Sequence, residues 1–416
     1  MRMKKYIFFI ALIFLCVNLF LSLMLSSCKV NNRENSSILQ NEKSNDSSTD
    51  LKDEKEEKPG EEHNALNSQN EETLDKMIGE MIILGFKATE VNKSSKIIKD
   101  INEYGIGGII LFDYDVPTKS FPRNIINPLQ VKKLIEDIKT MTRNDLFICL
   151  DAEGGLVNRL KSKYGFMQMD SPQKMGESEP EETFLKASAL GIELDYLGFN
   201  LNFAPVVDVN VNPDNPVIGH LERSFSDDPY EVYRHSLNFI DAMHEFNIIT
   251  ALKHFPGHGS STEDSHLGLT DVTDTYKEKI ELIPYEKLIS ENKTDIIMTA
   301  HIMNRNIDAV NPATLSPLFL QDILRDKLRF NGLIVSDDMQ MGAIVEHFGF
   351  EEAIVKAINA GCNILIFSNN GSIYDEDIAQ KAVEAIKKAV EKGEIKEEVI
   401  IKSYNRIIEL KNKFKI

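Results

Sequence analysis

Short apolar, β-rich runs alternate with longer amphipathic stretches from about residue 74 onward, and this alternation constrains the fold more than any other feature. A repeated strand-then-helix pattern predicts a parallel sheet with helical crossovers. The predicted strands span 81–86, 107–112, 146–151, 200–206, 248–254, 295–300, 332–337 and 363–367. The predicted helices between them include 129–141, 181–197, 230–246, 316–328 and 350–360.

Eight strand–helix units in about 340 residues predict an α/β fold, a (β/α)₈ TIM-type barrel. We expect one catalytic domain over residues 73–416, closed by helices at 379–390 and 397–411. A doubly wound open sheet is the alternative. It is disfavoured because no Gly-x-Gly-x-x-Gly segment follows the first predicted strand.

Polar residues stand at or just past the C-terminal ends of five predicted strands. In a barrel these ends meet at one face, where active sites are built. The residues are Asp151, Asp208, the Lys253-His254 pair, His301 and Asp337. The sequence therefore predicts one polar site at this face.

The densest group of polar residues is the segment 253–266, Lys-His-Phe-Pro-Gly-His-Gly-Ser-Ser-Thr-Glu-Asp-Ser-His. In it, Asp264 and His266 are two positions apart. A carboxylate at that spacing can fix one imidazole nitrogen while the other faces a substrate, which suits general acid/base work near neutral pH. Asp264 could instead cap a turn, and we expect His258 to brace the Pro-Gly loop.

Asp337 ends the strand predicted at 332–337, where a carboxylate facing the site could act as a nucleophile. We expect its neighbour Asp338 to support the turn. The acids of the Asp-Ala-Glu-Gly-Gly run at 151–155 could bind hydroxyls or a metal ion. A metal-dependent hydrolase is thus an alternative, but no His-x-His or His-Glu-x-x-His pattern is present. We expect neither a metal nor a cofactor.

The N-terminal segment has the pattern of a targeting signal. Arg2, Lys4 and Lys5 precede an apolar run over 6–25, as in a secretory signal. Leu-Ser-Ser-Cys at 25–28 resembles a bacterial lipobox, in which the cysteine, here Cys28, is lipidated. We therefore predict a signal peptide over 1–27 and an extracytoplasmic lipoprotein anchored to a membrane. An uncleaved membrane anchor is the alternative.

Residues 28–72 are polar and acidic, with almost no large apolar side chains, which predicts a disordered tether. The whole chain carries a formal charge of −18, from 47 basic and 65 acidic residues. This charge argues against nucleic acid as a partner. Cys149 and Cys362 lie in apolar runs and are expected to be buried thiols. No tryptophan is present, so any sugar stacking must use phenylalanine, tyrosine or aliphatic faces.

Taken together, these motifs resemble glycoside hydrolase family 3, in its bacterial β-N-acetylhexosaminidase branch. The resemblance extends from about residue 74 to the C-terminus. The Lys-His-Phe-Pro-Gly-His-Gly string with Asp-x-His downstream separates this branch from the β-glucosidases of the family. The other shared segments are 107–112, 151–155, 202–208, 215–219, 223–225 and 336–338.

The resemblance implies an exo-acting, retaining β-N-acetylglucosaminidase. Asp337 would be the nucleophile, His266 the acid/base and Asp264 the residue that orients His266. The resemblance also implies that the non-reducing sugar is held by Asp151, Arg159, Arg223, Lys253 and His254.

The predicted location outside the cytoplasm favours peptidoglycan fragments (muropeptides) as the β-N-acetylglucosamine-containing substrate. Chitin oligosaccharides, or another β-sugar, remain an alternative substrate. A sugar-binding lipoprotein with a dead site is an alternative from a different class. The sequence departs from the family pattern at Leu156, where arginine is usual, and at Ser260-Ser261, which replace a common Asp-Thr.

Overall fold

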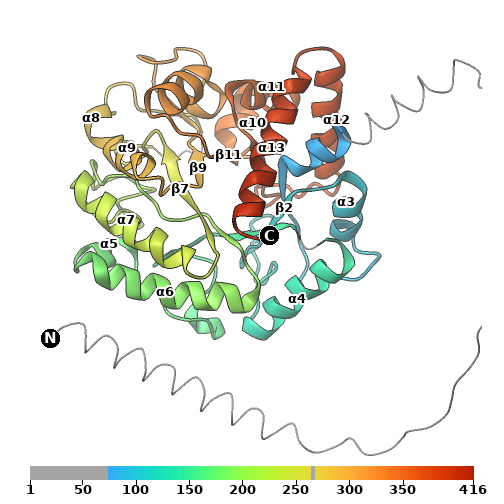
Figure 1. The fold of residues 1–416 in the computed structure, drawn as a ribbon, viewed down its shortest axis with the longest axis horizontal. Coiled ribbons are helices and arrows are strands. Elements are labelled where there is room, and N and C mark those ends of the chain that lie inside the picture. The colour runs from blue at the N-terminus through green and yellow to red at the C-terminus, as the bar shows by residue number, and fades with distance from the viewer. Residues whose placement is uncertain (1–73, 144, 264–267) are drawn as a thin grey trace, which may run out of the picture. The chain divides into compact units, whose positions relative to one another are not determined.

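Eight parallel strands close into a barrel in the computed structural model (Figure 1), which describes residues 74–143, 145–263 and 268–416. Around the barrel the strands follow the order β1 (Ile82–Gly85), β12 (Ile364–Phe367), β11 (Leu333–Asp338), β9 (Ile296–Thr299), β7 (Ile249–Phe255), β6 (Leu201–Asn202), β3 (Phe147–Leu150) and β2 (Gly108–Ile110). Every predicted strand is present, and the predicted TIM-type barrel is confirmed.

Helices surround the strands in Figure 1. The longer ones are α3 (Lys96–Tyr104), α4 (Pro128–Met141), α6 (Pro180–Leu197), α7 (Pro229–His244), α9 (Ile283–Ser290), α11 (Phe350–Ala360), α12 (Ile378–Glu391) and α13 (Glu397–Lys413). Shorter helices are α5 (Pro172–Gly176), α8 (Glu278–Glu281), α10 (Gly342–Phe348), η1 (Ser162–Tyr164) and η2 (Ala313–Leu315). The helix expected at 316–328 is present as a π-helix, η3 (Leu318–Lys327).

Helix starts follow the local sequence. Proline occupies the first turn of α4, α6 and α7, where its missing N–H leaves no bond unmade. The side chain of Asn127 caps α4, and that of Asp228 caps α7, each by accepting a hydrogen bond from a backbone N–H of the first turn.

One strand is much shorter than expected. A seven-residue strand was expected at 200–206, but β6 spans only Leu201–Asn202. Pro205 has no backbone N–H and cannot donate to a ladder. Pairing continues past β6 only at single points, such as the bridge between Val206 and Lys253. This irregular stretch leads into the loop that carries Asp208.

The core lies inside the barrel and between the barrel and its helices. The residues of β3, β7, β9 and β12 are all buried. One face of each strand is covered by the side chains that fill the barrel interior, and the other face is covered by the surrounding helices. Cys149 and Cys362 are both buried and unpaired thiols, as expected. Within the described residues, no helix is both long enough and apolar enough to cross a membrane.

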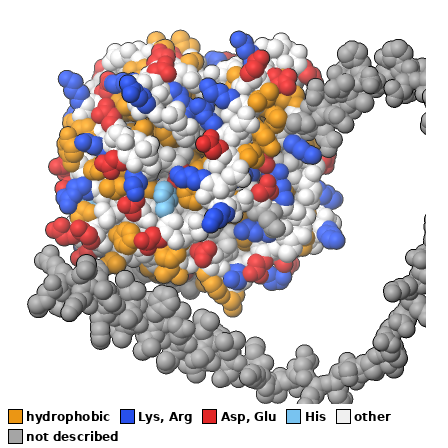
Figure 2. Space-filling model, in the orientation of Figure 1, with side chains coloured by type: hydrophobic (Ala, Val, Ile, Leu, Met, Phe, Trp, Pro, Cys, Tyr) orange, Lys and Arg blue, Asp and Glu red, His pale blue; other side chains and the backbone are white. Residues whose placement is uncertain are grey.

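Two short strand pairings lie outside the barrel in the described part of the chain. β4 (Ala152–Gly154) and β5 (Val157–Asn158) form an antiparallel hairpin directly after β3. β8 (Thr270–Asp271) pairs with β10 (Ile302–Met303). On the face that Figure 2 shows, acidic and basic side chains are interspersed rather than gathered into a patch of one sign.

Candidate active site

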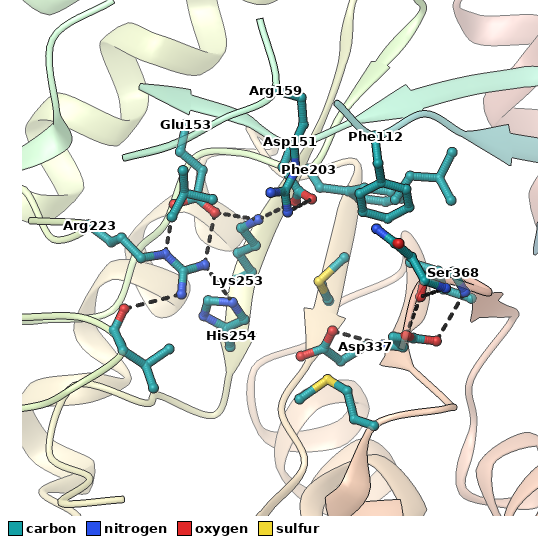
Figure 3. A pocket seen from close by; sticks show the side chains of 18 of the residues that line it. Phe112, Asp151, Glu153, Arg159, Phe203, Arg223, Lys253, His254, Asp337 and Ser368 are labelled. Carbon is teal, nitrogen blue, oxygen red and sulfur yellow. Dashed lines mark hydrogen bonds and ion pairs between the residues drawn. The ribbon is translucent and has the colours of Figure 1, made fainter. Parts of the chain in front are cut away.

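A pocket with a volume of about 370 Å³ opens at the C-terminal ends of the barrel strands (Figure 3). Its lining from the strands and their immediate ends includes Ile110, Asp151, Phe203, Lys253, Met298, Asp337 and Ile366. The predicted placement of polar residues at this face therefore holds for Asp151, the Lys253-His254 pair and Asp337.

Lys253 is the centre of a group of charges on one side of the pocket. Its Nζ lies 2.8 Å from Oδ1 of Asp151 and 2.6 Å from Oε1 of Glu153. Arg159, which follows β5, places Nη2 3.1 Å from Oδ2 of Asp151. Burial raises the pKa of Asp151, but the charges of Lys253 and Arg159 outweigh it and lower the pKa overall. Asp151 is therefore an anion held between two cations.

Arg223 extends this group. Its Nε and Nη2 each lie 2.8 Å from a carboxylate oxygen of Glu153, in a two-bond ion pair that is buried. Burial raises the pKa of Glu153, and the charges of Arg223 and Lys253 more than reverse that rise. We call Asp151, Glu153, Arg159, Arg223 and Lys253 the charged cluster. Sequence reasoning gave Glu153 no definite role.

His254 connects the charged cluster to Asp208. Nη2 of Arg223 lies 3.1 Å from Nε2 of His254, and a guanidinium can only donate. Nε2 must then accept, so the proton of a neutral imidazole stands on Nδ1 and is donated to Oδ2 of Asp208, 2.7 Å away. This chain of contacts fixes both the tautomer and the orientation of the ring.

Asp208 is fully buried and acts as a hub for the backbone around it. It accepts from the backbone N–H of His254 at 3.2 Å and from that of His258 at 2.7 Å. Burial raises its pKa, but His254 and the other donors hold the pKa below its usual range. The sequence placed Asp208 at this face without a role, and the structure shows it supporting His254.

The segment after Lys253-His254 is packed tightly against its neighbours. A Cβ on Gly259 would lie 1.7 Å from the backbone oxygen of Val209, so only glycine fits there. His258 lines the pocket, and its Nδ1 lies 2.7 Å from Oγ of Ser261. Burial and the nearby His254 lower the pKa of His258 to about 4, so this ring is neutral at pH 7. These contacts agree with the bracing role expected for His258.

Asn215 links two loops of the site. Its Nδ2 donates to the backbone oxygen of His258 at 2.7 Å, and its Oδ1 accepts from the N–H groups of Val217 and Ile218 at 2.8 Å. The Asn-Pro-x-Ile-Gly segment thus holds the loop that presents Arg223 against the loop that contains His258.

Asp337 lies near the end of β11 and lines the pocket across from the charged cluster (Figure 3). Its Oδ1 accepts from the N–H of Asp338 at 2.7 Å. Asp338 has a different task, because its Oδ1 accepts from the N–H groups of Ser368 and Gln340. Burial raises the pKa of Asp338. Asp338 therefore holds the turn after β11, as expected, although it lines the pocket together with Asp337.

His301, expected at the site, is fully buried and does not line the pocket. Its Nε2 lies 3.0 Å from the backbone oxygen of Asp338, and its Nδ1 lies 2.8 Å from Oγ1 of Thr314. It supports the end of β11 from behind. Asp264, His266 and Cys28 lie outside the described residues.

Sequence reasoning missed the apolar part of the pocket lining, which we call the apolar wall. This wall includes Phe112, Tyr114, Val116 and Met341. The only signal was a tyrosine and a valine standing among Asp, Pro, Thr, Lys and Ser at 113–120. Among the described residues, no three His, Cys, Asp or Glu side chains are grouped so that they could hold a metal ion.

The family model described as "Glycosyl hydrolase family 3 N terminal domain" matches residues 73–410. The chain belongs to glycosyl hydrolase family 3. The match covers the barrel, the pocket and the closing helices, and it confirms the family that the motifs resemble.

Similar proteins of known sequence and of known structure agree with this family. Beta-hexosaminidase A of Pseudoalteromonas piscicida is 32 % identical over 379 residues, which are 82 % of this chain and 61 % of that protein. Beta-hexosaminidase of Haemophilus influenzae strain ATCC 51907 / DSM 11121 / KW20 / Rd is 38 % identical over 257 residues, 60 % of this chain and 71 % of that protein. A solved glycoside hydrolase family 3 beta-N-acetylglucosaminidase from Paenibacillus sp. str. FPU-7 superposes with a TM-score of 0.74 at 32 % identity, covering 82 % of this chain and 62 % of that one. The chain thus spans less than two thirds of the first and third of these proteins.

Proposed function

We propose that this protein is an exo-acting, retaining β-N-acetylglucosaminidase that removes a terminal N-acetylglucosamine from the non-reducing end of a glycan. The observation that carries the proposal is the position of Asp337, which faces the charged cluster across one pocket. A glycosidase that retains configuration needs a nucleophile at the anomeric carbon and groups that hold the sugar in place. The similarity to bacterial beta-hexosaminidases supports the choice of sugar.

The charged cluster suits a sugar rich in hydroxyls. The side chains of Asp151 and Arg159 remain partly exposed, 15 % and 29 %, so each can reach a ligand while it stays paired. An ionised carboxylate accepts hydrogen bonds from hydroxyls, and a guanidinium donates to hydroxyl or carbonyl oxygens. Lys253, Arg223 and His254 complete the set that we assign to the hydroxyls and the acetamido group.

The reaction takes two steps. A carboxylate oxygen of Asp337 forms a bond to the anomeric carbon while the glycosidic bond breaks, and His266 gives its proton to the leaving oxygen. His266 then takes a proton from water, and the resulting hydroxide displaces Asp337 from the same carbon. Asp264 orients His266 throughout. The sequence supports these two roles through the Asp-Ser-His spacing that follows the loop at 253–263.

The place of action is part of the proposal. The basic start, the apolar run and the Leu-Ser-Ser-Cys at 25–28 support a lipoprotein with a signal peptide over 1–27, lipid on Cys28 and a tether over 28–72. An enzyme tethered outside the cytoplasm would meet peptidoglycan fragments. Cys28→Ser should move the protein from the membrane fraction to the soluble fraction, and retention at the membrane would contradict lipidation.

The activity is tested by comparing an aryl β-N-acetylglucosaminide with an aryl β-glucoside, with and without a chelator. We expect turnover of the acetamido sugar only, insensitive to the chelator and lost in Asp337→Ala. A folded wild-type protein that cleaves neither sugar would favour a sugar-binding role. Loss of activity with the chelator would favour a metal-dependent hydrolase. Comparing muropeptides with chitin oligosaccharides then decides the natural substrate.

A further inference from the structure

We propose that residues 113–122, between β2 and α4, form the subsite for the leaving sugar, with the ring of Tyr114 as its stacking surface. We call these residues the rim segment. The inference rests on the proposed function and deepens it, because it names the substrate class. The protein would favour β-linked oligosaccharides whose leaving group is itself a pyranose ring.

The rim segment is held rigidly at its base. Asp115 is fully buried, and its carboxylate pairs with the guanidinium of Arg123, which is 1 % exposed, and with Nζ of Lys87 at 2.7 Å. Nη2 of Arg123 also donates to the backbone oxygen of Asn369 at 2.7 Å. The N–H groups of Asp115 and Ser120 donate to each other's backbone oxygens at 2.8 and 3.1 Å. A segment fixed in this way loses little conformational freedom when a ligand binds.

A single residue after β12 positions the segment over the pocket. Oδ1 of Asn370 accepts from the N–H of Val116 at 3.0 Å, and its Nδ2 donates to the backbone oxygen of Tyr114 at 3.1 Å. β12 is the neighbour of β11 in the barrel, and β11 carries Asp337. The rim segment is therefore tied to the sector of the barrel that holds the nucleophile.

The two sides of the pocket differ in chemistry. Glu153, Arg223 and Lys253 stand on one side in Figure 3, and Phe112 and Ser368 on the other. Between them, Asp337 lies at the lower edge, and Asp151 and Arg159 lie at the upper edge. The guanidinium of Arg159 is 5.3 Å from the centre of the Phe112 ring. A sugar whose hydroxyls are held by the charged cluster and whose anomeric carbon meets Asp337 directs its reducing end away from the cluster. The next sugar then reaches the wall formed by Tyr114 and Val116, which line the same pocket.

These two side chains present apolar surface that the protein leaves uncovered. Tyr114 is 41 % exposed and Val116 is 44 % exposed. Exposed apolar side chains gathered at the wall of a pocket mark a ligand surface more often than scattered ones do. A tyrosine ring offers a flat apolar face for the C–H groups of a pyranose and loses few rotamers on binding. The chain has no tryptophan that could serve instead.

The test compares two substrates that differ only in the leaving group, chitobiose and N-acetylglucosaminyl fluoride, whose leaving group is a single atom. In Tyr114→Ala we expect kcat/KM for chitobiose to fall about tenfold, the loss of one aromatic contact, and kcat/KM for the fluoride to stay within about twofold. Tyr114→Phe should behave like the wild type. The matched control is Tyr196→Ala on α6, an exposed tyrosine that lies against Lys132 and outside the pocket.

The following results would overturn either the subsite inference or the proposed function. Unchanged chitobiose turnover in Tyr114→Ala, or an equal loss on both substrates, overturns the inference. Turnover of the fluoride also reports that the variant is folded, and Val116→Ser, which should lower only chitobiose turnover, provides a second probe of the same wall. Wild-type protein that turns over neither substrate would overturn the proposed function instead.

Discussion

The guanidinium of Arg223 donates two hydrogen bonds of 2.8 Å to the carboxylate of Glu153, although the residues are 70 positions apart in the sequence. The same guanidinium reaches Nε2 of His254, and Glu153 also pairs with Lys253. One carboxylate thus fixes two cations of the charged cluster and, through Arg223, the orientation of the histidine. The site is therefore assembled before any ligand enters.

Removing this carboxylate should cost stability as well as binding. Glu153→Gln leaves Arg223 and Lys253 buried with one fewer counter-charge, so we expect the free energy of unfolding to fall by about 3–5 kcal/mol. Urea denaturation measures the change. The control is Glu177→Gln, which breaks the exposed pair with Lys174 and should leave stability unchanged. A Glu153→Gln protein as stable as the wild type would show that the ion pair is not needed for the fold.

Glu281 should make stability depend on pH. It accepts from the N–H groups of Ser260 and Lys277, and burial raises its pKa from 4.5 to about 7. The folded state therefore holds this proton more tightly than the unfolded state. The stabilisation that this group contributes should be full below pH 4.5 and decline as the pH rises through about 7, by on the order of 3 kcal/mol.

This dependence is measured as the difference in unfolding free energy between wild type and Glu281→Gln across pH 4 to 8. As the pH rises, the unfolding free energy of the wild type should fall relative to that of Glu281→Gln, because glutamine cannot ionise. Glu398→Gln, at an exposed position on α13, is the control and should leave the profile of the wild type intact. A difference that stays flat with pH would contradict the raised pKa.

The acid role that we propose for His266 predicts a dependence on the leaving group. His266→Ala should slow hydrolysis of a disaccharide by about 10²–10⁴-fold and that of an activated aryl glycoside far less, because the aryl oxygen needs little protonation. Asp264→Asn should give an intermediate loss, since orientation survives and the charge does not. Steady-state kinetics on both substrates measures the contrast. Equal losses on both would rule out an acid role for His266.

The barrel could be read from the sequence because each strand is buried on both faces and so appears as a short apolar run bounded by polar residues. Asp151, Lys253 and Asp337 could be placed for the same reason, since each follows or ends such a run. The length of β6 could not be predicted from the sequence. Pro205 prevents regular pairing inside an apolar stretch that otherwise has the pattern of a strand.

The partners of the site residues were not predictable. Nothing in the spacing of Glu153 and Arg223 shows that they meet, because the contact depends on how the β4–β5 hairpin and the loop after β6 fold over the barrel. The role of Asp208 depends likewise on three-dimensional contacts with His254 and His258. The rim segment was missed because its apolar side chains are isolated in a polar loop. They follow neither the two-residue repeat of a strand nor the repeat of a helix.

The most direct test of the account asks whether Asp337 forms a bond to the sugar. An activated N-acetylglucosaminyl donor with fluorine at C5 should slow the breakdown of a glycosyl-enzyme enough for mass spectrometry and peptide mapping. We predict a mass increase of one sugar on the peptide that contains Asp337, and none in Asp337→Asn. A label on another carboxylate, or continued turnover with no label on the protein, would contradict Asp337 as the nucleophile.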